Sequence, residues 1–388
     1  MPWSAVTPPP SRPRRSSDPF AGDYIVTAPA PRPGIMDIRP YVGGESAIEG
    51  VDRILKLSSN EGALGPSPKA MEALRAMAPE MHRYPDGGAE DLRKAIGARF
   101  GLDASRIVCG AGSDELLGIL CRAYAGPGDE VLYSAHGFLM YAIAAKACGA
   151  TPVTAPEVDL TANVDNLLAA VTPRTKILFL ANPNNPTGTY LPATEVARLR
   201  AGLRADILLV IDAAYTEFVS RNDYSGGIEL VEAGDNVVVC RTFSKMYALG
   251  GLRLGWAYCP ENVAGVLNRV RNPFNVGAPA LAAGLAAFND TAYAELCKSH
   301  NDYWLPWLSG QLAELGLTVV PSVCNFILVR FPKDAGKDAG AADKFLRSKG
   351  IIVRAMGGYG LGDCLRITIG TGEENQLVVA ALKEFVGA

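Results

Sequence analysis

The chain has 388 residues, of which 48% are hydrophobic and 20% charged, and its 37 Lys and Arg residues against 40 Asp and Glu residues give a net charge of −3. This length predicts roughly two to three domains' worth of sequence, with enough apolar residues for a sizeable core. The near-neutral charge excludes binding of nucleic acid through a basic surface, and the apolar runs are far shorter than the roughly 18 residues of a membrane-spanning helix.

The eight cysteines are scattered without a Cys-x-x-Cys pair, and there are three histidines. These residues offer little for a metal site, and reduced thiols in a cytosolic protein are the simplest interpretation. We therefore expect no metal cofactor and a cytoplasmic location.

The first 33 residues differ from the rest of the chain. They contain three consecutive prolines at 8–10, a run rich in serine and arginine at 11–17, and further prolines at 29, 31 and 33. A segment of this composition does not bury an apolar face, so we expect residues 1–33 to form a disordered extension. It lacks the apolar stretch of a secretory signal.

From about residue 56 to residue 275, short apolar runs alternate with longer amphipathic stretches, which is typical of an α/β fold. Ser67 followed by Pro68 predicts the start of a helix over residues 69–81. A second helix is expected over 116–124. Strands are predicted at 106–109, 176–180, 207–211 and 236–240. Three of them are almost wholly apolar, as parallel strands covered by helices on both faces are.

The pattern changes after about residue 279. Residues 364–369 alternate apolar and polar side chains, which predicts a half-exposed antiparallel strand, and Thr371 with Glu374 forms a capping box for a last helix that runs to Val386. Further strands are expected at 325–329 and 351–353. We therefore predict three ordered parts: an N-terminal segment (34–60) that packs with the small domain, a large domain (61–278) and a small α+β domain (279–388).

Polar motifs follow the ends of the predicted strands, where open parallel sheets bind their ligands. The first motif, Gly110 to Glu115, leads from a strand into a helix, and its small residues let backbone N–H groups approach a phosphate. An ordinary tight turn explains this loop equally well. The third glycine of a dinucleotide site is absent, because position 115 is Glu, and so is the Lys-Ser or Lys-Thr pair of a nucleotide-binding loop.

The second motif, Asn182 to Gly188, holds two prolines between three asparagines, and rigid prolines direct an amide side chain out of the sheet edge. A loop selected for turn propensity is the alternative. The third is Asp212, which ends the apolar run 207–211. An unpaired buried carboxylate costs several kcal/mol, so Asp212 needs a partner, either a helix N-terminus or a protonated ring nitrogen.

The fourth motif surrounds Lys245, which stands among hydroxyls, glycines and aromatic residues. Lysines are usually solvated, but an amine held in such a pocket near a second cation is a nucleophile that forms Schiff bases. Thr242, Ser244 and Arg253 are residue types that bind phosphate.

Together the motifs describe one ligand. It has a phosphate, a cationic ring nitrogen for Asp212, a phenolic oxygen for Asn185 and Tyr215, and an aldehyde for Lys245. Pyridoxal phosphate carries all four groups, and a lysine Schiff base with an acidic partner for the ring nitrogen is the recognised binding pattern for it.

With these motifs in this order, the sequence resembles the fold-type-I pyridoxal-phosphate aminotransferases, and among their class-II members the histidinol-phosphate aminotransferase family. The resemblance covers about residues 35–386 and rests on these segments: 59–61, 65–68, 83–87, 112–115, 184–188, 212–215, 242–245, 251–255 and 365–371. It implies a large domain with a mostly parallel seven-stranded sheet sandwiched by helices, a smaller α+β domain, and pyridoxal 5'-phosphate as the cofactor.

The resemblance also assigns roles. Lys245, Asp212 and Tyr215 are the implied catalytic residues: Lys245 forms the Schiff base and moves the proton, and Asp212 keeps the ring nitrogen protonated. Tyr84 is implied to reach the phosphate of the neighbouring subunit's cofactor, and hence a homodimer with shared sites. The other implied cofactor-binding residues are Gly112, Ser113, Asp114, Phe138, Asn185, Thr242, Ser244 and Arg253.

Arg354 and Arg366 resemble the family's anion-binding pair, and Asn60 is a further expected substrate contact. For Arg366, a salt bridge to Asp363 or Glu373 is the alternative.

The sequence departs from the family pattern at two places. Gly62, Ala63 and Leu64 replace the usual residues after the first motif, and His136 stands near the stacking residue Phe138, where a proline is more usual. We expect His136 to be a hydrogen-bonded structural residue.

The resemblance implies amino transfer between L-histidinol phosphate and 2-oxoglutarate, giving imidazole acetol phosphate and glutamate in histidine biosynthesis. An aminotransferase for phenylalanine or tyrosine is the near alternative, and a threonine-phosphate decarboxylase shares many motifs. A non-catalytic binding module is the hypothesis from another class, and the presence of all residues needed for the cofactor chemistry argues against it.

Overall fold

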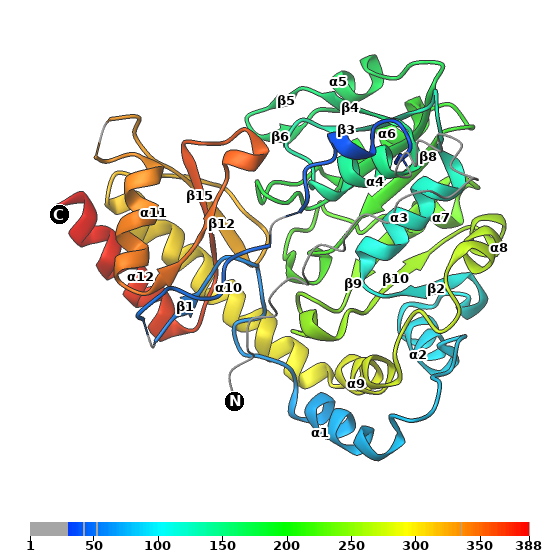
Figure 1. Cartoon of the computed structure of the whole chain (residues 1–388), viewed down its shortest axis with the longest axis horizontal. Coiled ribbons are helices and arrows are strands. Elements are labelled where there is room, and N and C mark those ends of the chain that lie inside the picture. Colours follow the sequence, from blue (N-terminus) through cyan, green and yellow to red (C-terminus); the bar gives the residue numbers. More distant parts are fainter. Residues whose placement is uncertain (1–29, 42, 52, 335, 388) are drawn as a thin grey trace, which may run out of the picture.

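The computed structural model describes residues 30–387 apart from positions 42, 52 and 335, so residues 1–29 of the predicted disordered extension lie outside the described residues. A larger α/β unit and a smaller α+β unit lie side by side, and the long helix α10 (Thr291–Glu314) links them (Figure 1).

A seven-stranded sheet forms the centre of the larger unit, in the order β2-β10-β9-β8-β7-β3-β4. Within it, β10 is antiparallel to both neighbours, and the other pairs are parallel. The predicted α/β class and the mostly parallel seven-stranded sheet are confirmed, and the four predicted strands are β2, β7, β8 and β9. The strands are β2 (Ile107–Gly110), β3 (Glu130–Ser134), β4 (Thr151–Ala155), β7 (Thr175–Ala181), β8 (Leu208–Asp212), β9 (Val237–Thr242) and β10 (Gly255–Tyr258).

Helices cover both faces of this sheet, as its apolar strands require. On one face, α3, α4 and α8 pack against the strands with Leu116, Tyr141 and Leu267 in a shared core. On the other face, α2, α5, α6 and α9 bury residues such as Ile96 and Leu199. The helices are α2 (Glu90–Phe100), α3 (Ser113–Tyr124), α4 (Met140–Cys148), α5 (Val164–Ala169), α6 (Ala193–Gly202), α7 (Ile228–Glu232), α8 (Glu261–Val270) and α9 (Ala278–Asn289).

Helix α1 (Pro68–Ala76) begins as predicted, because the Ser67 hydroxyl accepts a hydrogen bond from the Ala70 N–H at 3.1 Å. The predicted end at residue 81 is wrong. The helix stops at Ala76, and a separate 3-10 turn, η2 (Ala78–Glu80), follows. Pro79 explains the difference, because it has no N–H to donate and disfavours helical geometry in the residue before it.

The smaller unit holds a four-stranded antiparallel sheet in the order β11-β12-β15-β14 and a parallel pair formed by β1 and β13. The predicted capping box is present, since the Glu374 carboxylate accepts from the Thr371 N–H at 2.8 Å and the Thr371 hydroxyl accepts from the Glu374 N–H at 3.3 Å. The elements outside the large sheet and its helices are β1 (Leu55–Lys56), β5 (Glu157–Val158), β6 (Thr161–Ala162), β11 (Thr318–Val320), β12 (Phe326–Arg330), α11 (Ala339–Ser348), β13 (Ile351–Ile352), β14 (Arg354–Ala355), β15 (Cys364–Thr368) and α12 (Gly372–Val386).

Strand β15 is antiparallel as predicted, but the expectation that it is half-exposed is wrong, because all five of its residues are buried. Its polar side chains are covered by residues 58–60 from the start of the chain. Arg366 donates to the Ser58 carbonyl at 2.9 Å, and the Thr368 hydroxyl accepts from the Asn60 N–H at 2.9 Å. Polar alternation therefore marks a contact between distant segments here rather than a surface in water.

The N-terminal segment touches both units. The turn η1 (Ile35–Asp37) lies against α4, where Lys146 donates to the Asp37 carbonyl at 3.2 Å, whereas β1 pairs with β13. Helix α9 contributes Phe288 to the core of the large sheet, and α10 contributes Leu308 to the core of the smaller unit. We therefore propose that the two domains divide within α10 rather than at residue 279.

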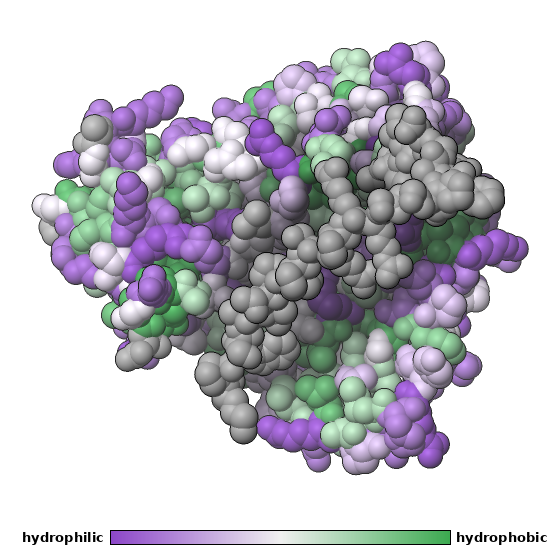
Figure 2. Space-filling model, viewed as in Figure 1, coloured by the Kyte–Doolittle hydropathy of each residue, from purple (hydrophilic) through white to green (hydrophobic). Residues whose placement is uncertain are grey.

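No helix in the described part of the chain is long and apolar enough to cross a membrane. Figure 2 shows hydrophilic residues spread over both units on the visible face, with hydrophobic residues gathered at the bottom, over α1 and α9.

Candidate active site

A pocket opens at the carboxyl ends of β7, β8 and β9, where the large sheet meets β14, β15 and residues 58–60. It brings together all the site residues predicted from the sequence except Gly112 and Tyr84. Those that line it are Asn60, Ser113, Asp114, Phe138, Asn185, Asp212, Tyr215, Thr242, Ser244, Lys245, Arg253, Arg354 and Arg366.

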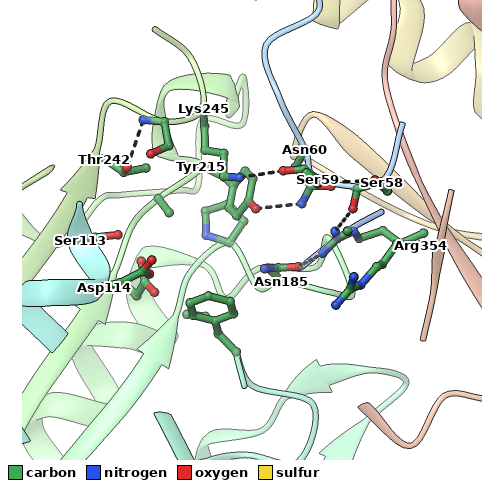
Figure 3. Close-up of a pocket in the computed structure, with 18 of the residues that line it drawn as sticks. Ser58, Ser59, Asn60, Ser113, Asp114, Asn185, Tyr215, Thr242, Lys245 and Arg354 are labelled. Carbon is green, nitrogen blue, oxygen red and sulfur yellow. Dashed lines mark hydrogen bonds between the residues drawn. The ribbon is translucent and has the colours of Figure 1, made fainter. Parts of the chain in front are cut away.

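One end of the pocket is suited to an anion. Helix α3 begins here at Ser113, and among the described residues no side chain caps it, so its first N–H groups are left for a ligand. The Arg253 guanidinium donates to the Ser244 hydroxyl at 3.2 Å and lies 3.1 Å from the Asp114 carboxylate. Figure 3 shows Ser113, Asp114 and Thr242 together on this side. Hydroxyls, N–H groups and one guanidinium thus surround this end of the pocket. We call this set, Ser113, Asp114, Thr242, Ser244 and Arg253, the anion cradle.

Gly112 stands behind this cradle rather than in its lining. Its φ of 85° lies in the left-handed region, and a Cβ there would run into the Arg253 guanidinium. Glycine therefore lets the arginine approach the start of α3.

Asp212, at the end of β8, is buried beneath the pocket. Its Oδ2 accepts a hydrogen bond from the Tyr141 hydroxyl at 2.9 Å, whereas its Oδ1 accepts none from the residues that the structure describes. Burial raises the pKa of Asp212 to about 6, against the opposing effect of the Tyr141 hydrogen bond. One oxygen of a buried carboxylate is thus left for a cationic partner.

Lys245 follows β9 and reaches the segment 58–60 across the pocket. Its amine donates to the Ser59 carbonyl at 3.0 Å and stands 5.7 Å from the centre of the Tyr215 ring. Loss of hydration in the crowded pocket, with the Arg366 guanidinium nearby, lowers the pKa of Lys245 to about 8. About a tenth of the amine is therefore neutral, and nucleophilic, at pH 7, far more than for a solvated lysine.

The opposite end of the pocket carries two guanidinium groups. Arg366 is buried, donates to the Asn185 side-chain oxygen and to the Ser58 carbonyl, and has a pKa that burial lowers. The alternative salt bridges are wrong, because Asp363 pairs with Arg330 and Glu373 with Arg53. Figure 3 shows Arg354 on this same side, across the pocket from Ser113 and Asp114.

Asn60 sits at the junction of the two units. Its Nδ2 donates to the Tyr215 hydroxyl at 2.9 Å, and its backbone N–H donates to Thr368. The amide is thus already engaged with Tyr215, the residue expected beside the ring oxygen of the ligand.

Tyr141, which donates to Asp212, is a residue of the site that the sequence does not point to directly. A signal was present, since a tyrosine in the apolar helix α4 needs a partner for its hydroxyl, but the sequence does not name the partner. Tyr141 also contacts Phe138, whose ring centre lies 5.9 Å from its own. His136 is hydrogen-bonded to Glu157 at 2.7 Å, as expected. Tyr84 is not in the lining of its own chain's pocket and is 83% exposed.

The donor set fits pyridoxal phosphate. The unpaired Oδ1 of Asp212 suits a protonated ring nitrogen, the anion cradle suits a phosphate, and the Lys245 amine lines the same pocket. These groups are the ones such a cofactor requires from a protein.

Comparison with known proteins agrees with this geometry. The family model described as aminotransferase class I and II matches residues 52–382. The chain belongs to the class I and II aminotransferase family. It is therefore an enzyme of the transferase class.

Within this aminotransferase family, the chain is 58% identical over 361 residues to the histidinol-phosphate aminotransferase of Rhodospirillum centenum, with 93% of this chain and 99% of the relative covered. It is 52% identical over 362 residues to the enzyme of the same name from Rhodopseudomonas palustris, again covering 93% and 99%. A solved structure of the histidinol-phosphate aminotransferase from Sinorhizobium meliloti, in complex with pyridoxal-5'-phosphate, superposes with a TM-score of 0.84 at 31% identity and covers 93% of this chain and 99% of that one.

Proposed function

We propose that this aminotransferase moves the amino group of L-histidinol phosphate to 2-oxoglutarate in histidine biosynthesis, in the cytoplasm, with pyridoxal phosphate as its cofactor. The observation that carries the proposal is that one pocket holds the Lys245 amine, the anion cradle, the unpaired oxygen of the buried Asp212 and two arginines, Arg354 and Arg366. Figure 3 shows Ser113 and Asp114 on one side of this pocket and Arg354 on the other. Relatives at 58% and 52% identity carry the corresponding name.

The residues at the cradle would hold the cofactor's phosphate, and those in the middle its ring. Asn185 and Tyr215 would bind the ring oxygen, and Phe138 would lie on the ring face. The phosphate ligands would be Ser113, the Asp114 N–H, Thr242, Ser244 and Arg253. Pyridoxal phosphate, when bound, supplies an aldehyde carbon for the amino group and a ring that accepts the electron pair released at the substrate Cα.

The chain's own groups would control the protons. The ionised Asp212 would hold a proton on the ring nitrogen through Oδ1, which has no other partner among the described residues. Tyr141 would keep this carboxylate ionised by donating a hydrogen bond to Oδ2. The Lys245 amine, neutral above a pKa of about 8 and partly neutral below it, would take the proton from the substrate Cα and deliver it to the carbon of the cofactor's aldehyde group, on the other side of the amino nitrogen.

The two arginines would bind the anionic end of each substrate. A guanidinium matches phosphate and carboxylate through two parallel N–H bonds, so one arginine pair serves the phosphate of histidinol phosphate and then a carboxylate of 2-oxoglutarate. Because Arg366 is held by Asn185 and Ser58, it is fixed before substrate arrives.

The test compares kcat/KM for histidinol phosphate and for phenylalanine, each with 2-oxoglutarate, on the purified enzyme. We expect a strong preference for histidinol phosphate and no turnover by K245A. A preference for phenylalanine would overturn the substrate assignment while leaving the aminotransferase chemistry in place.

We further propose that the enzyme is a homodimer in which Tyr84 reaches the partner's cofactor phosphate. Tyr84 stacks on Phe274 with ring centres 4.8 Å apart, and both rings, together with Met81, are exposed in the single chain. Exposed apolar side chains of this size are favoured at protein contacts. Sedimentation at equilibrium tests the dimer, and Y84A is expected to weaken pyridoxal phosphate binding.

A further inference from the structure

Glu115 and Asn275 lie directly behind the anion cradle. Glu115 is the third residue of α3, and its Oε2 accepts from the Ala111 N–H at 2.7 Å and from the Asn275 side-chain amide at 2.7 Å. The same amide donates to the Cys109 carbonyl at 3.2 Å. The two side chains therefore tie both ends of the loop that leads from β2 into α3.

The charge of Glu115 is the wrong sign for a direct role in binding phosphate. A carboxylate in the first turn of a helix is favoured by the positive end of the helix dipole, so it competes with a bound anion for that site. Its position is instead explained by the hydrogen bonds that it accepts. Because Glu115 takes the N–H of Ala111, it fixes the residue that precedes the turn and leaves the N–H groups of Ser113 and Asp114 for a ligand.

Asn275 is itself held in place from outside the pocket. Its Oδ1 accepts from Arg271 at 3.1 Å, in the segment that follows α8. On another side the loop is bounded by Gly255 of β10, where a Cβ would collide with the backbone of Gly112 and Ser113. The loop is thus enclosed by backbone and side chains that leave it little freedom to move.

We propose that Glu115 and Asn275 act as positioning residues that hold the loop 110–114 in the shape that binds the cofactor's phosphate. This inference rests on the proposed function, because it takes the ligand of the cradle to be pyridoxal phosphate. It differs from a general role in stability, because the effect is specific for the phosphate and not for the ring.

The test measures equilibrium binding of pyridoxal phosphate and of pyridoxal, which lacks the phosphate, to cofactor-free full-length protein. We expect E115A and N275A each to weaken binding of pyridoxal phosphate about tenfold, since each loses hydrogen bonds that fix the loop. Pyridoxal binding should stay within about twofold of wild type. E115Q keeps an acceptor oxygen and removes the charge, so it should bind pyridoxal phosphate as tightly as wild type or more tightly.

E195A is the matched control, because Glu195 is the third residue of α6 and lies outside the pocket lining. Unfolding midpoints test whether each variant folds. If E115A does not fold, the binding affinities of N275A and E115Q test the inference. Tighter or unchanged pyridoxal phosphate binding by both E115A and N275A would overturn the inference, as would equal weakening of pyridoxal and pyridoxal phosphate. If wild-type protein binds no pyridoxal phosphate, the proposed function itself fails.

Discussion

The hydrogen bond from Tyr141 to Asp212 offers the sharpest test of the proposed cofactor site. In Y141F the ring remains to pack on Phe179, with which it stacks at 4.6 Å, but Asp212 Oδ2 loses its donor. Both side chains are buried, so water does not readily replace the hydroxyl. The carboxylate form of Asp212 therefore becomes less stable relative to its protonated form.

The magnitude follows from the energy of such a bond. A hydrogen bond to a charged group contributes about 1.5–3 kcal/mol, and each pKa unit corresponds to about 1.4 kcal/mol, so the pKa of Asp212 should rise by about one to two units. From a starting value of about 6, this rise brings the pKa of Asp212 in Y141F to near neutral pH or above. Below its pKa, Asp212 must lose a proton before it can pair with a ring cation, and cofactor affinity then falls about tenfold per pH unit.

The assay is a titration of cofactor-free protein with pyridoxal phosphate between about pH 5 and pH 9, with affinity plotted against pH. The bend set by Asp212 should lie near pH 6 in wild type and one to two units higher in Y141F, whereas the bend set by the Lys245 amine near pH 8 should be the same in both proteins. Y133F is the matched control, because Tyr133 packs edge-on to Tyr141, whereas the hydrogen bond to Asp212 comes from Tyr141. An Asp212 bend at the same pH in Y141F and wild type would refute the role assigned to Tyr141.

Four further predictions use other parts of the structure. D212N should abolish transamination yet stabilise the cofactor-free protein by up to about 3 kcal/mol. Because burial raises the Asp212 pKa from 3.8 to about 6, this gain should grow as the pH rises between those two values and stay constant above them, as urea unfolding at several pH values would show. Labelling of Lys245 by a small aromatic aldehyde, followed by peptide mass spectrometry, should rise through pH 8 rather than near the usual value of 10.5, and an ordinary profile would contradict the assigned environment. G255A should weaken pyridoxal phosphate binding, measured by equilibrium titration, because its methyl group displaces the Gly112–Ser113 backbone; unchanged affinity would count against that clash. T371A should lower the free energy of unfolding by about 1 kcal/mol, because α12 loses its capping hydroxyl, and should leave kcat unchanged. A lower kcat in T371A would argue against a purely local role of this cap.

Local rules sufficed for much of the fold. The apolar runs at β7 and β8 and the capping pairs at Ser67 and Thr371 depend on neighbours in sequence, and the structure places them within a residue or two of the predicted bounds. Apart from Gly112 and Tyr84, the predicted cofactor-binding residues line one pocket, because the carboxyl ends of parallel strands share one edge of a sheet.

The wrong end of α1 has a local cause in Pro79, whereas two other features escaped prediction because distant segments meet there. The alternation in β15 has the pattern of a solvent-exposed strand, and only the presence of residues 58–60, more than 300 positions earlier, shows why Arg366 and Thr368 are buried. Tyr141 was missed for the same reason, since its partner Asp212 lies 71 positions away and on a different element. Side-chain pairing across such separations is set by tertiary packing and leaves no local pattern.

The pairing of β1 with β13 bears on how the enzyme is made. Leu55 pairs with Ile351, roughly 300 positions later, and at synthesis rates of about 5–20 residues per second the first strand waits between about 15 seconds and a minute for its partner to be translated. All seven strands of the large sheet are synthesised within that interval, so this sheet can collapse first while Leu55 and Leu57, both buried in the finished protein, remain without their cover. Arg366 is translated later still. A nascent or truncated chain that ends before Arg366 therefore contains the cofactor-binding strands but lacks one of the two arginines at the substrate end of the pocket.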